Sequence, residues 1–357
     1  MATDYKKISQ FNEEQLGKDR ASRMSQVAMY ADTAHFVYEL LQNADDAGAT
    51  EIQFRVSDEK LVVEHNGTPF TEDNVKAISY FGKGKTDITK IGHFGLGFKS
   101  VFAYTAAPCV HSGAESFEIT QLYSVAATRY PNDLKRGRTR FVLPFDHLIR
   151  NPNYIECRKL KPAKNAYEEI VSKLANLGAG TLLFTKSLME IKWEAREKGG
   201  HYLREDTTVD ERAREIYIIT GDSKEHCFLV FDRSVAWKEA DGEDKAHRPV
   251  QIAFALNKRL AEDGTIEAVE EARLFVFFPT DKETHVGFIL QGPYRTTPAR
   301  DNIPSDDDFN RHLVQETAAL LADSLQHIKK LKLLNLVALN TLPINHDKFK
   351  ENRKSVV

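Results

Sequence analysis

Three polar residues at helical spacing form the first candidate site. In the segment YELLQNADDAGAT, Glu39, Asn43 and Asp46 stand at positions i, i+4 and i+7, so an α-helix would bring them to one face. Asn43 offers a hard amide oxygen to Mg²⁺, and Glu39, one turn earlier, could orient and deprotonate a water. This grouping suits magnesium-nucleotide chemistry. A solvated polar stripe on an amphipathic helix is the alternative interpretation.

A glycine-rich stretch, KTDITKIGHFGLGFKSVF, forms the second candidate site. Gly92, Gly95 and Gly97 would let the backbone approach a ligand, and a helix beginning after them would direct unpaired N–H groups toward a phosphate. Positive charge comes from Lys83, Lys85 and Lys99. The spacing G-x-x-G-x-G is neither a Rossmann fingerprint nor a P-loop. A flexible loop is the alternative.

Together the two segments resemble the N box and the glycine-rich box of the GHKL (Bergerat-fold) ATPases. This superfamily contains gyrase, the ninety-kilodalton heat-shock chaperone, histidine kinases and MutL. ELLQNADDA is followed about fifty residues later by IGHFGLGFKSVF, in the order and separation of the family. Within the superfamily, the sequences of the two motifs are most similar to those of the heat-shock chaperone and of the sacsin-like branch.

The resemblance implies a role for each matching residue. Glu39 is similar to the family's catalytic base, Asn43 to its magnesium ligand, and Asp46 to the acid that closes the N box. A further set resembles the stretch whose backbone amides hold the phosphates: Gly92, His93, Phe94, Gly95, Leu96, Gly97 and Phe98. Residues 82–90, which include Lys85, resemble the ATP lid.

The segment EHNGTPF departs from the family's second box, D-x-G-x-G. His65 stands where the family has an aspartate that accepts a hydrogen bond from adenine, Gly67 is kept, and Pro69 replaces the second glycine. The resemblance thus assigns base recognition to His65, Asn66 and Gly67. A neutral His65 or the Asn66 amide oxygen could accept that bond, but without the aspartate's charge, so we expect looser adenine selection. A packed histidine at a strand end is the alternative.

Two later segments complete the site that the resemblance implies. Thr181 in GAGTLLF resembles the threonine whose hydroxyl helps to hold adenine. The loop QGPYRTTPARDNIP resembles the middle-domain loop that sends an arginine to the terminal phosphate, with Arg300 as the best match and Arg295 in reserve. A guanidinium there would pair with charge on the transferred phosphoryl oxygens. A structural salt bridge is the alternative for Arg300.

The elements that must position these residues follow from apolar spacing. Helices are predicted within residues 20–47, 72–82 and 167–177, and from residue 98 onward. Strands of the first part are predicted at 51–56, 60–65, 116–130, 138–145 and 180–186. Strands follow again from residue 216, and Leu spacing predicts a helix from about Asp306.

These elements give an α+β fold: a Bergerat-type α/β sandwich ATPase domain, an α/β transducer-like middle domain and C-terminal helices. The predicted boundaries are a GHKL-type ATP-binding domain at 1–190, a charged linker at 191–215, the middle domain at 216–304 and the helical segment at 305–357. A linker is predicted at 191–215 because this segment is densely charged, contains a double glycine and has weak apolar periodicity.

Composition excludes several classes of protein. The 357 residues are 41% hydrophobic and 28% charged, which indicates a globular chain, and the net charge of -3 provides no general attraction to nucleic acid or anionic lipid. Three widely spaced cysteines indicate neither a disulfide framework nor a cysteine zinc site. The polar start and the lack of an apolar run of about 20 residues favour a cytoplasmic protein without a membrane span.

We therefore expect a slow Mg-dependent ATPase whose lid closure drives domain or dimer rearrangement, with chaperone-like or defence-like work, as part of a longer protein. ATP and Mg²⁺ are the expected cofactors. A homodimer through the ATPase domain and a protein client or effector are the expected partners, and nucleic acid is not. The alternatives are a nucleotide-sensing scaffold that binds ATP without significant hydrolysis and, from the NADDAGAT wording, a MutL-like DNA repair ATPase.

Overall fold

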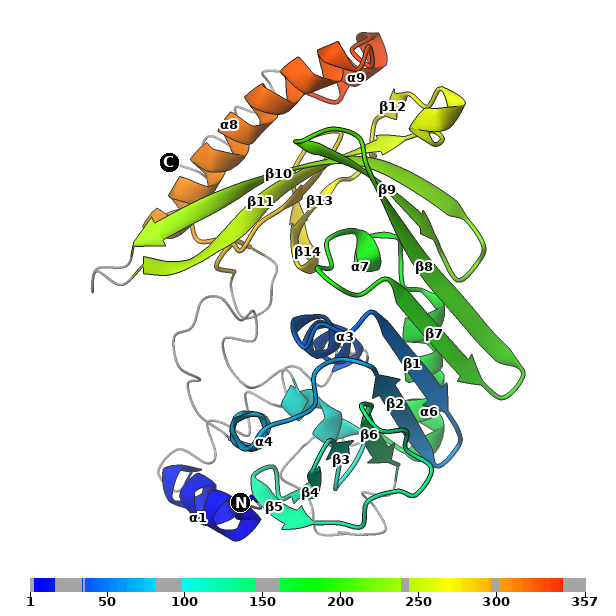
Figure 1. The fold of residues 1–357 in the computed structure, drawn as a ribbon, viewed down its shortest axis with the longest axis vertical. Helices are drawn as coiled ribbons and strands as arrows, with labels where there is room; N and C mark the ends of the chain where they lie inside the picture. The colour runs from blue at the N-terminus through cyan, green and yellow to red at the C-terminus, as the bar shows by residue number, and fades with distance from the viewer. Residues whose placement is uncertain are drawn as a thin grey trace. The chain divides into compact units, whose positions relative to one another are not determined.

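The computed structural model describes residues 3–16, 34, 36–80, 98–145, 161–238, 244–296 and 302–342. The chain divides into two compact units, which are coloured by residue number in Figure 1. Unit 1 comprises Met1–Leu177 and Thr185–Tyr202, and unit 2 comprises Gly178–Phe184 and Leu203–Val357.

Unit 1 contains a mixed sheet with the strand order β7-β1-β2-β6-β3-β4-β5. Its strands are β1 (Glu51–Val56), β2 (Lys60–His65), β3 (Cys109–Ser112), β4 (Glu115–Thr120), β5 (Ser124–Ala127), β6 (Thr139–Pro144) and β7 (Glu190–Ala195). The β1–β7 pair is parallel, and the neighbouring β1–β2, β2–β6 and β3–β6 pairs are antiparallel. Strand β7, near the end of the unit's sequence, therefore pairs directly with the early strand β1.

Alternating burial along these strands explains how the unit 1 sheet forms. In β2, Leu61, Val63 and His65 are buried while the residues between them are only partly buried, so a single face is covered, as in a layered α+β domain. The helices of the unit are α1 (Tyr5–Leu16), α3 (Phe36–Asp46), α4 (Glu72–Ser79), α6 (Ala163–Ala175) and the 3₁₀ helix η1 (Phe98–Ala103). Helix α3 packs against η1 and α6, and α1 packs against β5.

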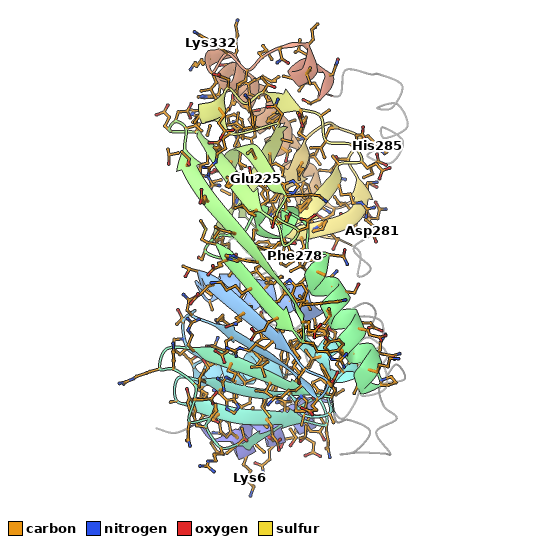
Figure 2. All side chains as sticks on the ribbon, turned by 90° about the vertical axis from the view of Figure 1, so that its right-hand side faces the viewer. Lys6, Glu225, Phe278, Asp281, His285 and Lys332 are labelled. Atoms are coloured by element: carbon orange, nitrogen blue, oxygen red, sulfur yellow. The ribbon has the colours of Figure 1, made fainter. Side chains whose placement is uncertain are left out.

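Unit 2 contains a largely antiparallel sheet with the order β14-β13-β15-β11-β10-β9-β8, and β12 pairs with β11. Its strands are β9 (Ala213–Ile219), β10 (Glu225–Lys238), β11 (Asp244–Leu256), β12 (Ile266–Glu267), β13 (Arg273–Val276), β14 (Phe278–Glu283), β15 (Ile289–Gln291) and the second part of β8 (Lys198–Thr208). On β14, Phe278 is buried and Asp281 is exposed, and both are labelled in Figure 2.

The long helix α8 (Asp308–Lys330) lies along β10 and β11 and covers one face of the unit 2 sheet (Figure 1). Its residues Leu313, Leu320 and Ile328 are buried at helical spacing and join the core formed with Phe231 and Phe254. The remaining helices are α7 (Gly180–Leu183), η2 (Leu260–Glu262) and α9 (Leu336–Asn340). Within the described ranges, no helix has the length and apolarity needed to cross a bilayer.

The α+β class predicted from the sequence is confirmed, since each unit is a sheet covered by helices. The strand predicted at 180–186 is wrong, because residues Gly180–Leu183 form helix α7. An ideal Cβ on Gly180 would lie 2.5 Å from Cζ of Phe275, so the backbone here packs directly on an aromatic ring. That packing overrides the strand propensity of the local sequence.

The charged linker predicted at 191–215 is not what the structure has there. Most of this range lies in β7, β8 and the start of β9. Along β8 only Tyr202 and Arg204 are buried, so charged side chains occupy the solvent face of the strand. Apolar periodicity is therefore weak in the sequence although the backbone is extended and paired.

Candidate functional site

Helix α3 carries the three polar residues predicted from the N-box wording. Its buried side is formed by Phe36, Val37, Leu40, Leu41, Gln42, Ala44 and Asp45. Glu39 is half-buried, whereas Asn43 and Asp46 are exposed, so all three lie away from the core-facing side. This arrangement leaves a carboxylate and an amide one helical turn apart on an accessible surface.

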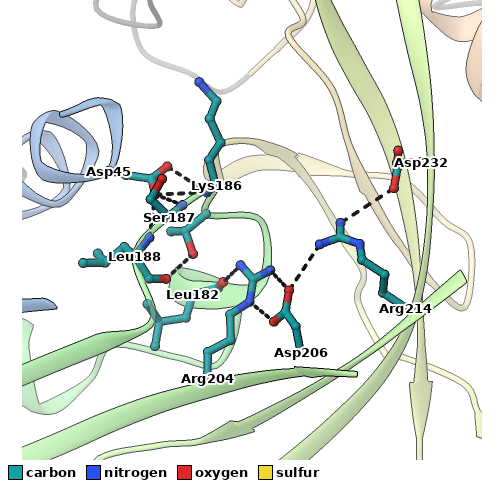
Figure 3. A network of polar contacts seen from close by, with 10 residues as sticks. Asp45, Leu182, Lys186, Ser187, Leu188, Arg204, Asp206, Arg214 and Asp232 are labelled. Atoms are coloured by element: carbon teal, nitrogen blue, oxygen red, sulfur yellow. Dashed lines mark hydrogen bonds and ion pairs between the residues drawn. The ribbon is translucent and has the colours of Figure 1, made fainter. Parts of the chain in front are cut away.

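Asp45 anchors the end of α3, a role that the sequence analysis did not assign. Its carboxylate is only 2% exposed and accepts hydrogen bonds from the backbone N–H groups of Lys186, Ser187 and Leu188 at 2.8–3.0 Å (Figure 3). Asp46 instead forms an ion pair with the side chain of Lys186, at 3.3 Å. The helix bearing Glu39 is thereby tied to the turn that leads into β7.

The end of β2 lies against the end of α3. An ideal Cβ on Gly67 would lie 2.9 Å from both Cβ and O of Ala47, and the Thr68 N–H donates to the Ala47 carbonyl at 2.8 Å. Only glycine fits this close approach without displacing the helix end. The glycine kept from the second box therefore fixes where β2 meets α3, one helical turn beyond Asn43.

His65 and Asn66 are both engaged by neighbouring backbone. The His65 ring is 1% exposed, and its Nδ1 accepts the Gly67 N–H at 3.1 Å. The Asn66 Oδ1 accepts the N–H groups of Thr50 and Glu51 at 2.9 and 3.2 Å. Desolvation by burial, assisted by the positive charge of Arg138, lowers the pKa of His65 from 6.5 to about 4, so the ring is neutral at pH 7.

Thr139 is a neighbour of His65 that the sequence analysis missed. It begins β6 in register opposite His65, is fully buried, and its hydroxyl lies 2.5 Å from the Ser112 hydroxyl. The segment GRTRFVLP carried a usable signal, a threonine after a glycine at the start of a strand. Thr181, to which the resemblance assigned the adenine contact, lies in α7 of unit 2 instead of on a strand.

Of the residues predicted to hold phosphates, the structure describes only Phe98. Its buried ring packs 5.9 Å from that of Phe141, which in turn lies 6.2 Å from the His65 ring. The remaining residues of this prediction lie outside the described part of the chain: Lys85, Gly92, His93, Phe94, Gly95, Leu96 and Gly97. Phe98, the first residue of η1, thus belongs to an aromatic cluster with Phe141 of β6 and His65 of β2.

Lys99, expected to add charge beside the phosphates, is fully buried. Its Nζ donates to the backbone carbonyls of Ser79 and Leu122 at 3.0 and 2.5 Å. Burial lowers the pKa of this lysine from 10.5 to about 7. Asn12 of α1 joins the same cluster by donating to the Ser79 hydroxyl at 3.1 Å. The Lys99 side chain therefore links the start of η1 to the end of α4.

In unit 2, the α7 segment is held by a buried guanidinium. Arg204 donates to the Leu182 carbonyl at 2.8 Å and makes two 2.6 Å bonds to Asp206. Asp206 also accepts from Arg214 at 3.2 Å, and Figure 3 shows this chain of charges. These contacts give the GAGTLLF segment a structural role within unit 2.

Two arginines are predicted to reach the phosphate, Arg300 and Arg295. Arg300 lies outside the described residues. Arg295 pairs with Asp307 at 3.1 Å, stacks over the Phe309 ring at 5.0 Å, and its backbone N–H donates to Asn310. Arg295 is thus fastened to the start of α8.

A metal at this site would draw on few protein groups. Within the described residues, no three His, Cys, Asp or Glu side chains come together as a metal centre. The exposed amide of Asn43 is nevertheless a suitable donor, because Mg²⁺ keeps several waters and phosphate oxygens and takes only one or two protein oxygens. The residues present therefore fit magnesium carried by a nucleotide.

Residues 19–121 match the Sacsin domain family. Protein NO VEIN of Arabidopsis thaliana is 25% identical over 325 residues, which are 86% of this chain and 12% of that protein. Sacsin of Homo sapiens is 31% identical over 198 residues, which are 47% of this chain and 4% of that protein. The resemblance to the sacsin-like branch predicted from the motifs is confirmed.

Among solved structures, the chain is similar to the ATPase domain of the mismatch repair endonuclease MutL from Aquifex aeolicus. The alignment covers 78% of this chain and 95% of the MutL domain, with 13% sequence identity and a TM-score of 0.36. The chain spans only a small part of both curated relatives, 12% and 4% of their lengths.

Proposed function

Proceeding from the sacsin-like family match, we propose that this chain binds Mg-ATP in unit 1 and slowly hydrolyses the terminal phosphate. The observation that carries the proposal is the arrangement of residues at the end of α3. Glu39 and Asn43 stand one turn apart on its accessible side, and Gly67 locks the end of β2 against the same helix. The N-box sequence and this local geometry support the same site.

In the proposed reaction, Glu39 orients a water for in-line attack and accepts its proton. Glu39 is half-buried on α3, one helical turn before Asn43. Asn43 holds the nucleotide through its amide oxygen. Magnesium, when bound, neutralises the charge on the phosphate oxygens. The backbone amides of residues 92–97 and the side chain of Lys85 are proposed phosphate contacts from the motif alone.

The proposed base site lies where β2 and β6 run side by side. His65, Asn66 and Gly67 come from the end of β2, and Thr139 stands opposite His65. We propose Thr139 for the adenine-side hydroxyl contact, because it shares a strand pair with His65. The contact assigned to Thr181 from the motif has no comparable support within unit 1.

Coupling of hydrolysis to conformation is part of the proposal. Closure of residues 82–90 over the nucleotide, arrival of Arg300 at the phosphate, and a domain or dimer rearrangement would make the protein a slow switch with chaperone-like or defence-like work. Support comes from the motifs and from the much greater length of the curated relatives. Clients and effectors would then bind other parts of the full-length protein.

Phosphate release tests the enzyme proposal. We expect Mg-dependent release by the wild-type chain and at least a tenfold loss in Glu39→Ala with nucleotide binding retained. Glu72→Ala is the matched control, because this exposed glutamate on α4 forms a surface ion pair with Lys76 of the same helix. Equal rates in wild type and Glu39→Ala would remove Glu39 from the mechanism. Asn43→Ala should abolish magnesium-dependent binding itself.

A nucleotide-sensing scaffold is the second candidate function. It is favoured by the second box, in which a neutral, buried His65 replaces a charged aspartate. For this function we expect ATP to bind tightly and to stay intact, even after prolonged incubation with magnesium and a partner protein. Measurable turnover that depends on Glu39 would decide for the ATPase.

A further inference from the structure

The hydrogen-bonding character of His65 follows from its contacts. A neutral imidazole has one nitrogen that accepts and one that donates. Because Nδ1 accepts the Gly67 N–H at 3.1 Å, the ring proton must sit on Nε2. Burial keeps the ring neutral at pH 7, since it lowers the pKa to about 4. His65 therefore offers a donor at its remaining nitrogen, where a carboxylate at this position would offer an acceptor.

The neighbouring Asn66 cannot supply the missing acceptor in this arrangement. Its Oδ1 already accepts two backbone N–H groups, from Thr50 and Glu51, which uses both lone pairs. Its Nδ2 donates to the Thr50 hydroxyl at 2.7 Å. The Asn66 side chain thus fastens the end of β2 to the start of β1, and its polar atoms are committed to that contact.

The position of the His65 ring is fixed from three sides. Gly67 leaves no room for a Cβ between the ring and α3, since its ideal Cβ would lie 3.1 Å from Nδ1 and 2.9 Å from Ala47. Thr139 stands opposite on β6, and the Phe141 ring lies 6.2 Å away. A ring held in this way keeps its donor in one place, so hydrogen-bond matching at this position is strict.

We propose that His65 selects the base by donating from Nε2, so that the site binds a 6-oxopurine nucleoside triphosphate at least as tightly as ATP. This inference rests on the proposed nucleotide site of unit 1. The 6-amino group of adenine is a donor, and two donors that face each other leave both hydrogen bonds unmade. The 6-oxo group of hypoxanthine or guanine is an acceptor and matches the His65 N–H.

The test measures binding of ATP and inosine triphosphate with magnesium by calorimetry on the full 357-residue chain. The two ligands differ at the purine 6 position and its protonated neighbour and share the ribose and the phosphates. We expect the wild-type dissociation constant for inosine triphosphate to be equal to or lower than that for ATP. We expect His65→Asp to reverse the order and to favour ATP by about tenfold, because a carboxylate accepts from the amino group.

His111→Asn is the matched control, since it replaces another largely buried histidine, on β3, and should leave the wild-type order unchanged. Wild type binding ATP more tightly than inosine triphosphate would overturn the inference while the nucleotide site stands. If neither triphosphate binds the folded wild-type chain, the proposed function falls and this inference with it. The wild-type comparison decides even if His65→Asp does not fold.

Discussion

Removing the Asp45 carboxylate should destabilise unit 1 far more than removing its neighbour Asp46. The Asp45 carboxylate is buried and accepts three backbone N–H groups. In Asp45→Ala the Leu188 N–H is left buried without a partner, which costs about 2 kcal/mol. The N–H groups of Lys186 and Ser187 can reach water, so each adds about 0.5 kcal/mol. The expected total is about 3 kcal/mol.

Two further variants sharpen this prediction. Asp45→Asn keeps the Oδ1 atom that accepts from Ser187 and Leu188, so we expect a loss of only about 1 kcal/mol. Asp46→Ala removes one exposed ion pair with the Lys186 side chain, and should change stability by less than about 0.5 kcal/mol.

Urea unfolding followed by tryptophan fluorescence can measure these differences in unit 1. The chain has two tryptophans, and Trp193 is buried in β7, directly after the turn that Asp45 holds. A Trp237→Phe background leaves Trp193 as the single reporter. The reasoning is refuted if Asp45→Ala and Asp46→Ala unfold at the same urea concentration with the same slope.

Three other substitutions test separate contacts. Gly67→Ala should cost about 2 kcal/mol, measured by the same unfolding assay, because the new methyl group meets Ala47 at 2.9 Å; unchanged stability would show that the helix end can shift. In the wild type, the free energy of unfolding should fall by about 3 kcal/mol between pH 6.5 and 4, because the unfolded chain binds the His65 proton more tightly than the buried ring does. His65→Gln should remove this fall. An unchanged pH dependence of stability in the variant contradicts the prediction. Arg204→Met should cost unit 2 about 2 kcal/mol in thermal unfolding, since the Leu182 carbonyl loses this donor and Asp206 keeps only the longer contact with Arg214; a neutral result would argue against the network.

The sequence predicted those elements whose burial pattern is local. Strands β1 and β2 were predicted with the observed bounds, because apolar and polar residues alternate in EIQFRV and KLVVEH. Helix α8 was expected from its leucine spacing. The accessible face of α3 also followed from spacing alone, since Glu39 and Asn43 are four residues apart.

The failures share one cause, which is contact with residues distant in sequence. Asp45 and Asp46 are adjacent acids, and nothing local shows that the first is buried under amides of residues 186–188. Lys99 follows a glycine-rich loop as a phosphate-binding lysine would, yet its partners are carbonyls of Ser79 and Leu122. Thr181 was assigned to a strand because its packing against unit 2 residues could not be foreseen.

The parallel pairing of β1 with β7 has a consequence for the nascent chain. Glu51 lies opposite Glu190, so β1 gains its parallel neighbour only after about 195 residues have left the ribosome. Until then the helix with the proposed catalytic glutamate lacks its tether. A fragment cut at residue 121, the end of the Sacsin domain match, would omit β5, β6 and β7 and would expose unpaired strand edges. The stretch that matches the Sacsin domain family is therefore shorter than unit 1, which extends to Tyr202.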